Sequence, residues 1–382
     1  MSKDQHKLKQ QHESLSRMKK SEQISSREHS LQLQKKLKRK TVGSHKDIKK
    51  NASKYLLGHP IVQVPRELDL IEGSCSICHN FFDTLRDVLK GNPKRIYLDF
   101  RLTTMLKAMP LLVMYSIIDE AREEDGVESD IRVMWSKRKG QVNRVIEFSG
   151  KFASAAEREE QMHSSSTLPI IMGDNARAND LSNAFVDYIL EKYYPDADAE
   201  KEQEISSAIQ ETVDNVGRHA YPDVEDHSRK RWWFSCHRIG DNLYIVIYDR
   251  GVGIPNSLSK NNAVFLSRIN NLYPDEYKGA TNDTVNEDMS KLDSLKAWFQ
   301  KNLTDGQLIR AAMHTNVTST DLDQHGQGSR SIKALISDHE NSYLLMFSNY
   351  GFYCYDNDRE DNEKSVDNTT NKLTGTLIQW SI

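Results

Sequence analysis

Residues 242–255 read NLYIVIYDRGVGIP, an apolar strand pattern that runs directly into an aspartate and two glycines. A buried strand that ends in this way places one carboxylate, that of Asp249, at the edge of a sheet. Gly251 and Gly253 carry no side chain, so the backbone after the strand can approach a flat ligand closely. The carboxylate can accept a hydrogen bond from an exocyclic amine. An ordinary Asp-Gly turn after a strand would leave the same pattern, and both interpretations stay open at this point.

A long helix is predicted upstream, over residues 199–220. Its apolar residues recur at helical spacing and define one buried arc: Ile205, Ala208, Ile209, Val213 and Val216. Glu211, Asn215 and His219 recur at every fourth position along one edge of that arc. A carboxylate and a carboxamide one turn apart suit activation of a water molecule and ligation of a hard cation such as Mg²⁺. Taken alone, this pair is common on helix edges.

Two further patterns lie near the C-terminus. HGQGSR at residues 325–330 precedes a helix predicted over 328–337, and a glycine-rich approach to a helix leaves free amides that attract phosphate. The final strand, predicted over 376–382, begins with GT. Loop and cap chemistry is the alternative explanation for both.

In this order, ETVDNVGRHA, DRGVGIP, HGQGSR and GTLIQW resemble the motifs of the GHKL superfamily. This is the Bergerat fold shared by gyrase B subunits, MutL, sensor histidine kinases and anti-sigma-factor kinases. The resemblance covers about residues 168–382. It implies a two-layer α/β sandwich, with a mixed sheet and helices on one face, that binds ATP and Mg²⁺.

The resemblance also implies a role for each matching residue. Glu211 would be the general base or water-orienting residue, Asn215 the Mg²⁺ ligand and Asp249 the adenine reader. The other implied nucleotide contacts are His219, Gly251, Gly253, Ile254, Thr320, Gly326, Gln327, Gly328, Ser329 and Thr376. An ATP lid would span about residues 255–325, where the hydroxyls of residues 318–320 could bond phosphate on closure. Ser329-Arg330 departs from the family, which often has a further glycine and an apolar residue there, so this loop either binds phosphate more weakly or uses Arg330 as a partner.

The segment before these motifs alternates strands and helices. Strands are predicted over 95–100 and 131–135, and helices over 107–122 and 142–152. Crossovers of this length imply parallel strands in an open α/β sheet. Through KRIYLDF and VNRVIEFSGKF the segment resembles a STAS-like module, the fold of anti-sigma-factor antagonists. Their phosphorylated serine lies at the start of the helix after the LDF-type strand, where this chain reads LKAMP, so the resemblance implies an interaction or packing role.

The chain of 382 residues is long enough for two domains. We predict a basic arm over 1–55, a STAS-like domain over 56–160 and a GHKL-type domain over 165–382, with the boundary in the polar, serine-rich stretch 153–167. Residues 1–50 carry 15 Lys and Arg against 5 Asp and Glu, a net charge of +10 that leaves −13 for the remainder. We expect the arm to be flexible or helical. It is either a solvated tail or an element that binds nucleic acid or an acidic partner.

Composition excludes several classes of protein. Hydrophobic residues make up 37% and charged residues 28%, which fits neither a wholly disordered nor a membrane-embedded chain. No stretch approaches the roughly 18 to 20 apolar residues of a spanning helix. The first thirty residues lack the apolar core of a secretion signal. We therefore expect a cytoplasmic protein that makes no membrane contact.

Cys75 and Cys78 stand in the sequence CSICH, which spells the haem c attachment pattern and also half of a zinc site. Haem attachment requires export, and a tetrahedral zinc site lacks a second cysteine pair, although histidines elsewhere could complete it. Structural or incidental cysteines are the simpler interpretation.

Taken together, the sequence favours an intracellular ATP-binding protein, a slow Mg²⁺-dependent ATPase whose lid closure changes contacts with a protein partner or a second copy of the chain. One alternative is a serine/threonine protein kinase of the anti-sigma-factor type. Another is a binding module in which nucleotide only stabilises the fold while the arm binds nucleic acid. A sensor histidine kinase is disfavoured because no His-Glu-rich dimerisation hairpin precedes the nucleotide domain.

Overall fold

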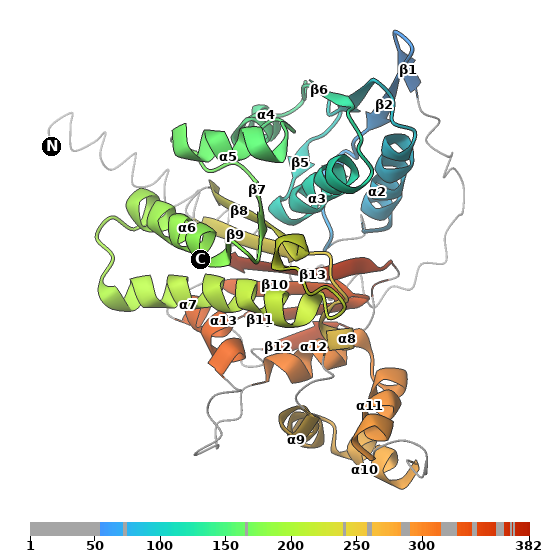
Figure 1. Cartoon of the computed structure of the whole chain (residues 1–382), viewed down its shortest axis with the longest axis vertical. Helices are drawn as coiled ribbons and strands as arrows, with labels where there is room; N and C mark the ends of the chain where they lie inside the picture. Colours follow the sequence, from blue (N-terminus) through green and yellow to red (C-terminus); the bar gives the residue numbers. More distant parts are fainter. Residues whose placement is uncertain are drawn as a thin grey trace, which may run out of the picture. The chain divides into compact units, whose positions relative to one another are not determined.

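The computed structural model describes most of the chain after the basic arm (Figure 1). The described residues are 54–71, 75–164, 167–239, 242–257, 262–283, 291–314, 327–337, 342–356, 363–366, 369 and 371–382. Residues 53–382 form one compact unit. Residues 1–53 of the predicted arm, Thr320 and Gly326 lie outside the described residues, so what was predicted for them stays a prediction, as do the domain limits. Lys54 and Tyr55, the last two residues of the predicted arm, belong to the first strand of the unit.

The first half of the unit contains a four-stranded sheet in the order β1-β2-β4-β6. Strands β4 and β6 are parallel, as predicted. Strand β2, which was not predicted, pairs in parallel with β4, and β1 is antiparallel to β2. The strands and the helices that connect them are β1 (Lys54–Leu56), β2 (His59–Gln63), α2 (Cys75–Lys90), β4 (Arg95–Asp99), α3 (Ala108–Glu124), β6 (Asp130–Met134) and α4 (Gly140–Phe148). A separate pair joins β3 (Glu67–Leu68) to β5 (Met105–Leu106). The chain leaves α4 four residues earlier than predicted, because Gly150, Lys151 and Phe152 all have positive φ.

The second half contains a seven-stranded sheet in the order β12-β11-β10-β13-β9-β8-β7. Its strands are β7 (Ile171–Asp174), β8 (Arg231–Ile239), β9 (Asn242–Asp249), β10 (Tyr343–Asn349), β11 (Gly351–Asp356), β12 (Glu363–Val366) and β13 (Leu373–Ser381). Every described pairing in it is antiparallel, so the predicted mixed sheet is wrong. The physical reason is connectivity: successive strands turn back on each other, and β13 inserts between β9 and β10 against the direction of both.

Helices cover both faces of this sheet, although the resemblance implied helices on one face only. The first face carries α6 (Ala178–Tyr193), α7 (Ala199–Asn215) and α13 (Gln327–Ser337). The second face carries α3, which is buried on almost all sides and packs against β8 and β9 as well as its own sheet. Trp232 and Trp233 consequently lie on opposite faces of β8, and both are buried.

A buried ion pair links the two halves of the unit. Arg158 lies on α5 (Ala155–Ser164), inside the stretch predicted as a polar boundary, and its side chain is fully buried. Its guanidinium donates to both carboxylate oxygens of Asp119 on α3, at 3.0 and 2.5 Å. The same carboxylate accepts a hydrogen bond from Trp233 Nε1 on β8 at 2.9 Å. The carboxylate of Asp119 on α3 therefore binds side chains of both α5 and β8, and so joins the two halves of the unit.

The segment between the first glycine motif, DRGVGIP at residues 249–255, and the second glycine motif, HGQGSR at residues 325–330, contains helices with an apolar cluster of their own. The helices are α8 (Ile254–Ser257), α9 (Asn262–Leu272), α10 (Pro274–Asp283), α11 (Lys291–Asn302) and α12 (Asp305–Met313). Ile269, Phe299 and Leu308 are among the buried members of the cluster. The described part of the predicted lid is therefore a small helical body that packs against β11 and β12 through α12.

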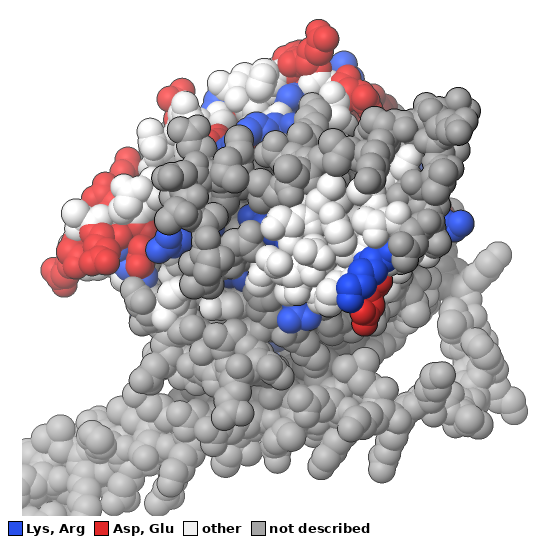
Figure 2. Space-filling model, turned by 90° about the horizontal axis from the view of Figure 1, so that it is seen from below, with Lys and Arg blue, Asp and Glu red and all other residues white. Residues whose placement is uncertain are grey.

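Charge on the described surface is uneven. The turn between α6 and α7 exposes Asp196, Asp198, Glu200 and Glu202. Seen from below in Figure 2, acidic side chains gather at the left and upper edges of the face, while its middle is uncharged. This acidic edge would repel a polyanion. In the part of the chain that the structure covers, no helix is long and apolar enough to cross a membrane.

Candidate functional site

Four elements meet at the turn formed by residues 249–254. Asp249 ends β9, and the sheet register places Thr376 of β13 directly opposite it. The turn also contacts Ala220, at the end of the helical segment that continues α7, and Ser348, near the end of β10. Residues that are separated by more than a hundred positions in the sequence therefore converge on the first glycine motif.

The carboxylate of Asp249 is buried, with 5% of the residue exposed. Burial raises the pKa of Asp249 to about 7, and hydrogen bonds from Gly251 and Thr376 oppose that rise. The Gly251 N–H donates to Asp249 Oδ1 at 2.8 Å. The site thus contains an acidic group that is close to half ionised at neutral pH.

Glycine is required at positions 251 and 253 because other parts of the chain approach the turn closely there. A Cβ on Gly251 would overlap the carbonyl oxygen of Ala220, which accepts a hydrogen bond from the next residue, Val252, at 2.8 Å. Gly253 has a φ of +82°, and a Cβ there would lie 2.6 Å from Asn349 Nδ2. Both glycines therefore face other parts of the chain, and this packing is compatible with a structural turn as well as with a ligand site.

Sequence reasoning missed two polar residues that hold the turn from the β10 side. Ser348 Oγ donates to the Gly375 carbonyl at 2.9 Å and accepts from the Ile254 N–H at 2.8 Å. Asn349 Nδ2 donates to the Val252 carbonyl at 3.0 Å, while Asn349 Oδ1 is buried with no hydrogen-bond partner among the described residues. The only sequence signal is a Ser-Asn pair before a turn, which is ordinary hairpin chemistry.

Glu211 and Asn215 lie on α7 as predicted, and both are half-buried. Regular α-helix ends at Asn215, and residues Val216–Ala220 form a π-helical turn that contains His219. Such turns are rare and recur at functional sites. Arg218 Nη2 lies 3.4 Å from Glu211 Oε2 and 3.4 Å from Asp214 Oδ2. The guanidinium of Arg218 therefore lies beside the Glu211 carboxylate. Their separation would allow the carboxylate to exchange this cation for another partner.

The second glycine motif is described only in part. Gln327, Gly328 and Ser329 form the first turn of α13, which packs along α7. Ser329 Oγ is buried with no hydrogen-bond partner in the described part of the chain. The structure thus packs α13 against the same helix that carries Glu211 and Asn215, while Thr320 and Gly326 are not placed.

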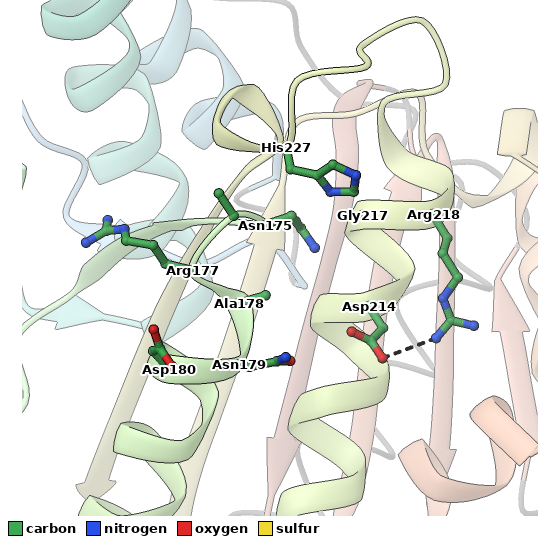
Figure 3. Close-up of a pocket in the computed structure, with 10 residues that line it drawn as sticks. Asn175, Arg177, Ala178, Asn179, Asp180, Asp214, Gly217, Arg218 and His227 are labelled. Carbon is green, nitrogen blue, oxygen red and sulfur yellow. Dashed lines mark hydrogen bonds and ion pairs between the residues drawn. The ribbon is translucent and has the colours of Figure 1, made fainter.

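A pocket of about 490 Å³ lies between α6 and the end of α7, and none of the predicted site residues lines it. Its lining comes from the start of α6, the end of α7 and the short helix His227–Arg229: Asn175, Ala176, Arg177, Ala178, Asn179, Asp180, Asp214, Gly217, Arg218 and His227. In Figure 3, Asn175 and Asn179 extend toward α7, whereas Arg177 points away. Both arginines are in ion pairs, Arg177 with Asp174 and Glu159 and Arg218 with Asp214 and Glu211. The lining thus carries Asp180, Asp214 and His227 as well as the two asparagines, whose side chains bond to Val213 and Gln210.

The cysteine motif lies at the start of α2, away from this site. Cys78 is buried, and its thiol donates to the Asp69 carbonyl at 3.1 Å. Burial raises the pKa of the Cys78 thiol to about 12, which disfavours the thiolate that a metal ligand requires. Among the described residues, no group of three or more His, Cys, Asp or Glu is arranged to hold a metal ion.

Comparison with known proteins adds no assignment. No protein-family model matches the chain, and a search of curated proteins found no significant match.

The raised pKa of Asp249 predicts a pH dependence of stability. An unfolded aspartate titrates near 3.9, so between about pH 4 and 7 the folded chain keeps a proton that the unfolded chain has lost. This group therefore destabilises the fold as pH rises through that range. Because of this group, wild type should lose unfolding free energy between pH 5 and pH 8. We expect the loss in Asp249→Asn to be smaller than that in wild type by about 2 to 4 kcal/mol.

Urea unfolding of both proteins at pH 5, 6, 7 and 8 measures this difference. Asp223→Asn, which makes the same change at an exposed aspartate, is the control. Identical pH profiles for wild type and Asp249→Asn would show that the carboxyl titrates normally.

Proposed function

We propose that the turn at residues 249–254 binds the adenine base of ATP, with Asp249 accepting a hydrogen bond from the exocyclic amine. The observation that carries this proposal is the buried Asp249 carboxylate, held by Gly251 and Thr376 beside a turn in which two glycines are required. Burial of an ionisable carboxyl among neutral donors costs stability, which an asparagine would avoid. A strongly shifted pKa in such a place favours recognition as the reason for the carboxyl.

The ordered GHKL-like motifs support the same proposal. Thr376, in the motif GTLIQW, lies opposite Asp249. Ala220, at the end of the motif ETVDNVGRHA, contacts the turn. The phosphates would then extend toward the start of α13, where free helix amides and the helix dipole favour anions. The unpartnered hydroxyl of Ser329 is one available donor there.

The residues along α7 fit the chemistry of a hydrated magnesium ion. Asn215 supplies one neutral amide oxygen, and Mg²⁺ commonly needs few protein ligands because phosphates and waters complete its shell. When bound, the ion would neutralise phosphate charge.

Hydrolysis would use Glu211. Its carboxylate would accept a proton from water as the water oxygen bonds to the γ-phosphorus and the bond to the β-phosphate oxygen breaks, releasing ADP and phosphate. Arg218 lies 3.4 Å from that carboxylate and would orient it. The helical body of α9 to α12 would move with nucleotide closure and change the surface offered to a protein partner or a second copy.

We expect Asp249→Asn to weaken ATP binding. A neutral amide cannot give the charge-assisted bond to the adenine amine, a loss of about 1.5 to 3 kcal/mol. Titration of the folded variant with a fluorescent ATP analogue measures the loss, and Asp223→Asn controls for the change in net charge. Unchanged affinity for Asp249→Asn would remove this residue from the site.

We expect Glu211→Ala to bind ATP and Mg²⁺ like wild type while releasing phosphate at least tenfold more slowly, of the order expected for a lost general base. Release of label from γ-labelled ATP provides the measurement. Asp214→Ala is the matched control, since Asp214 contacts the same Arg218 on the flank toward α6. Asn215→Ala should instead lose the Mg²⁺ dependence of binding. Equal turnover in all three variants would contradict the assignment of α7, and label transferred to protein in a cell lysate would favour the kinase alternative.

A further inference from the structure

Helix α3, from the first half of the unit, reaches the candidate adenine turn directly. Glu120 of α3 forms an ion pair with Arg250, the residue between Asp249 and Gly251. The side chains of Arg250 and Glu120 are 16% and 29% exposed, so the pair is shielded from water more than a surface salt bridge. The contact joins two segments that are 130 positions apart in the sequence.

Arg250 is fixed by its backbone as well as by its side chain. Its N–H donates to the Tyr221 hydroxyl at 3.1 Å, and that hydroxyl donates to the Arg231 carbonyl at 2.7 Å. Burial lowers the pKa of Arg250 to about 10, and the charge of Arg86 on α2 adds to this effect. A cation in this position needs a counter-ion, so the loss of Glu120 would leave an unfavourable buried charge that displaces the turn.

Other acidic residues of α3 contact the sheet without touching the turn. Asp119 accepts from Trp233, and Glu123 and Glu124 lie 3.8 and 3.5 Å from the guanidinium of Arg231. These contacts dock the helix on β8. Glu120 differs from them because its partner is part of the Asp249 turn.

We propose that Glu120 is a positioning residue of the nucleotide site, which sets the Asp249 turn through Arg250 and couples α3 to adenine recognition. This inference rests on the proposed function. Coupling between two elements is reciprocal, so nucleotide bound at the turn would hold α3 in place to the same extent that α3 favours the nucleotide.

The test compares ATP with inosine triphosphate, which has a carbonyl where adenine has the exocyclic amine. A carbonyl facing a carboxylate loses the hydrogen bond and adds repulsion, so a correctly placed Asp249 discriminates between the two nucleotides. Both affinities are measured by calorimetry on the full chain with Mg²⁺, for wild type, Glu120→Gln and Glu123→Gln. We expect Glu120→Gln to reduce the ratio of the affinities by about five- to tenfold, at the lower end of typical coupling, and Glu123→Gln to leave it unchanged.

Each outcome decides a separate claim. If wild type does not discriminate between the nucleotides, the proposed function fails. If wild type discriminates and Glu120→Gln discriminates equally, or weakens both nucleotides by the same factor, Glu120 has only a structural role and the inference fails. Arg250→Gln, alone and combined with Glu120→Gln, provides a second check, because the double variant should lose no more discrimination than either single variant if the two residues act as a pair.

Discussion

The carboxylate of Asp119 is the constraint on which the rest of the structure depends. It lies on a helix buried between two sheets, and it accepts hydrogen bonds from the fully buried guanidinium of Arg158 and from Trp233 of β8. Removal of either charge would leave the other unpaired in the core, which costs far more than a surface ion pair contributes. Because Trp233 lies on the strand beside β9, this one cluster fixes α3 against the sheet that carries Asp249. The first half of the unit is thus part of the scaffold that positions the candidate site.

Local sequence patterns predicted most of the regular structure, and long-range packing explains what they missed. Apolar strand patterns located β4, β6, β9 and β13, and helical spacing located α3 and α7, because each of these elements buries apolar side chains. The stretch around Arg158 is polar and rich in serine, so it read as a boundary; its helix is stabilised by a partner 39 positions away that no local pattern reveals. The burial of Trp233 also depends on distant packing, since α3 packs against β8.

In the candidate site, too, sequence patterns predicted some residues and missed others that depend on long-range contacts. The order of the motifs predicted that Asp249, Gly251, Gly253 and Thr376 belong together, and the strand register places Thr376 opposite Asp249. Ser348 and Asn349 could not be found in this way, because a polar pair before a hairpin turn is common and its function here depends on contact with residues almost a hundred positions earlier. The pocket between α6 and α7 was missed because its charged and amide side chains come from three separate elements and follow no distinctive spacing in the sequence.

The turn at residues 249–254 and the pocket between α6 and α7 therefore compete as the place where a nucleotide binds, and one measurement separates them. Amide hydrogen exchange of the full chain, followed by mass spectrometry with and without ATP and Mg²⁺, reports which backbone segments the ligand protects. We expect slower exchange at residues 249–254 and 373–377 and in the first turn of α13, with little change at residues 175–180. Protection at 175–180 with none at 249–254 would contradict the assignment of Asp249 as the adenine reader.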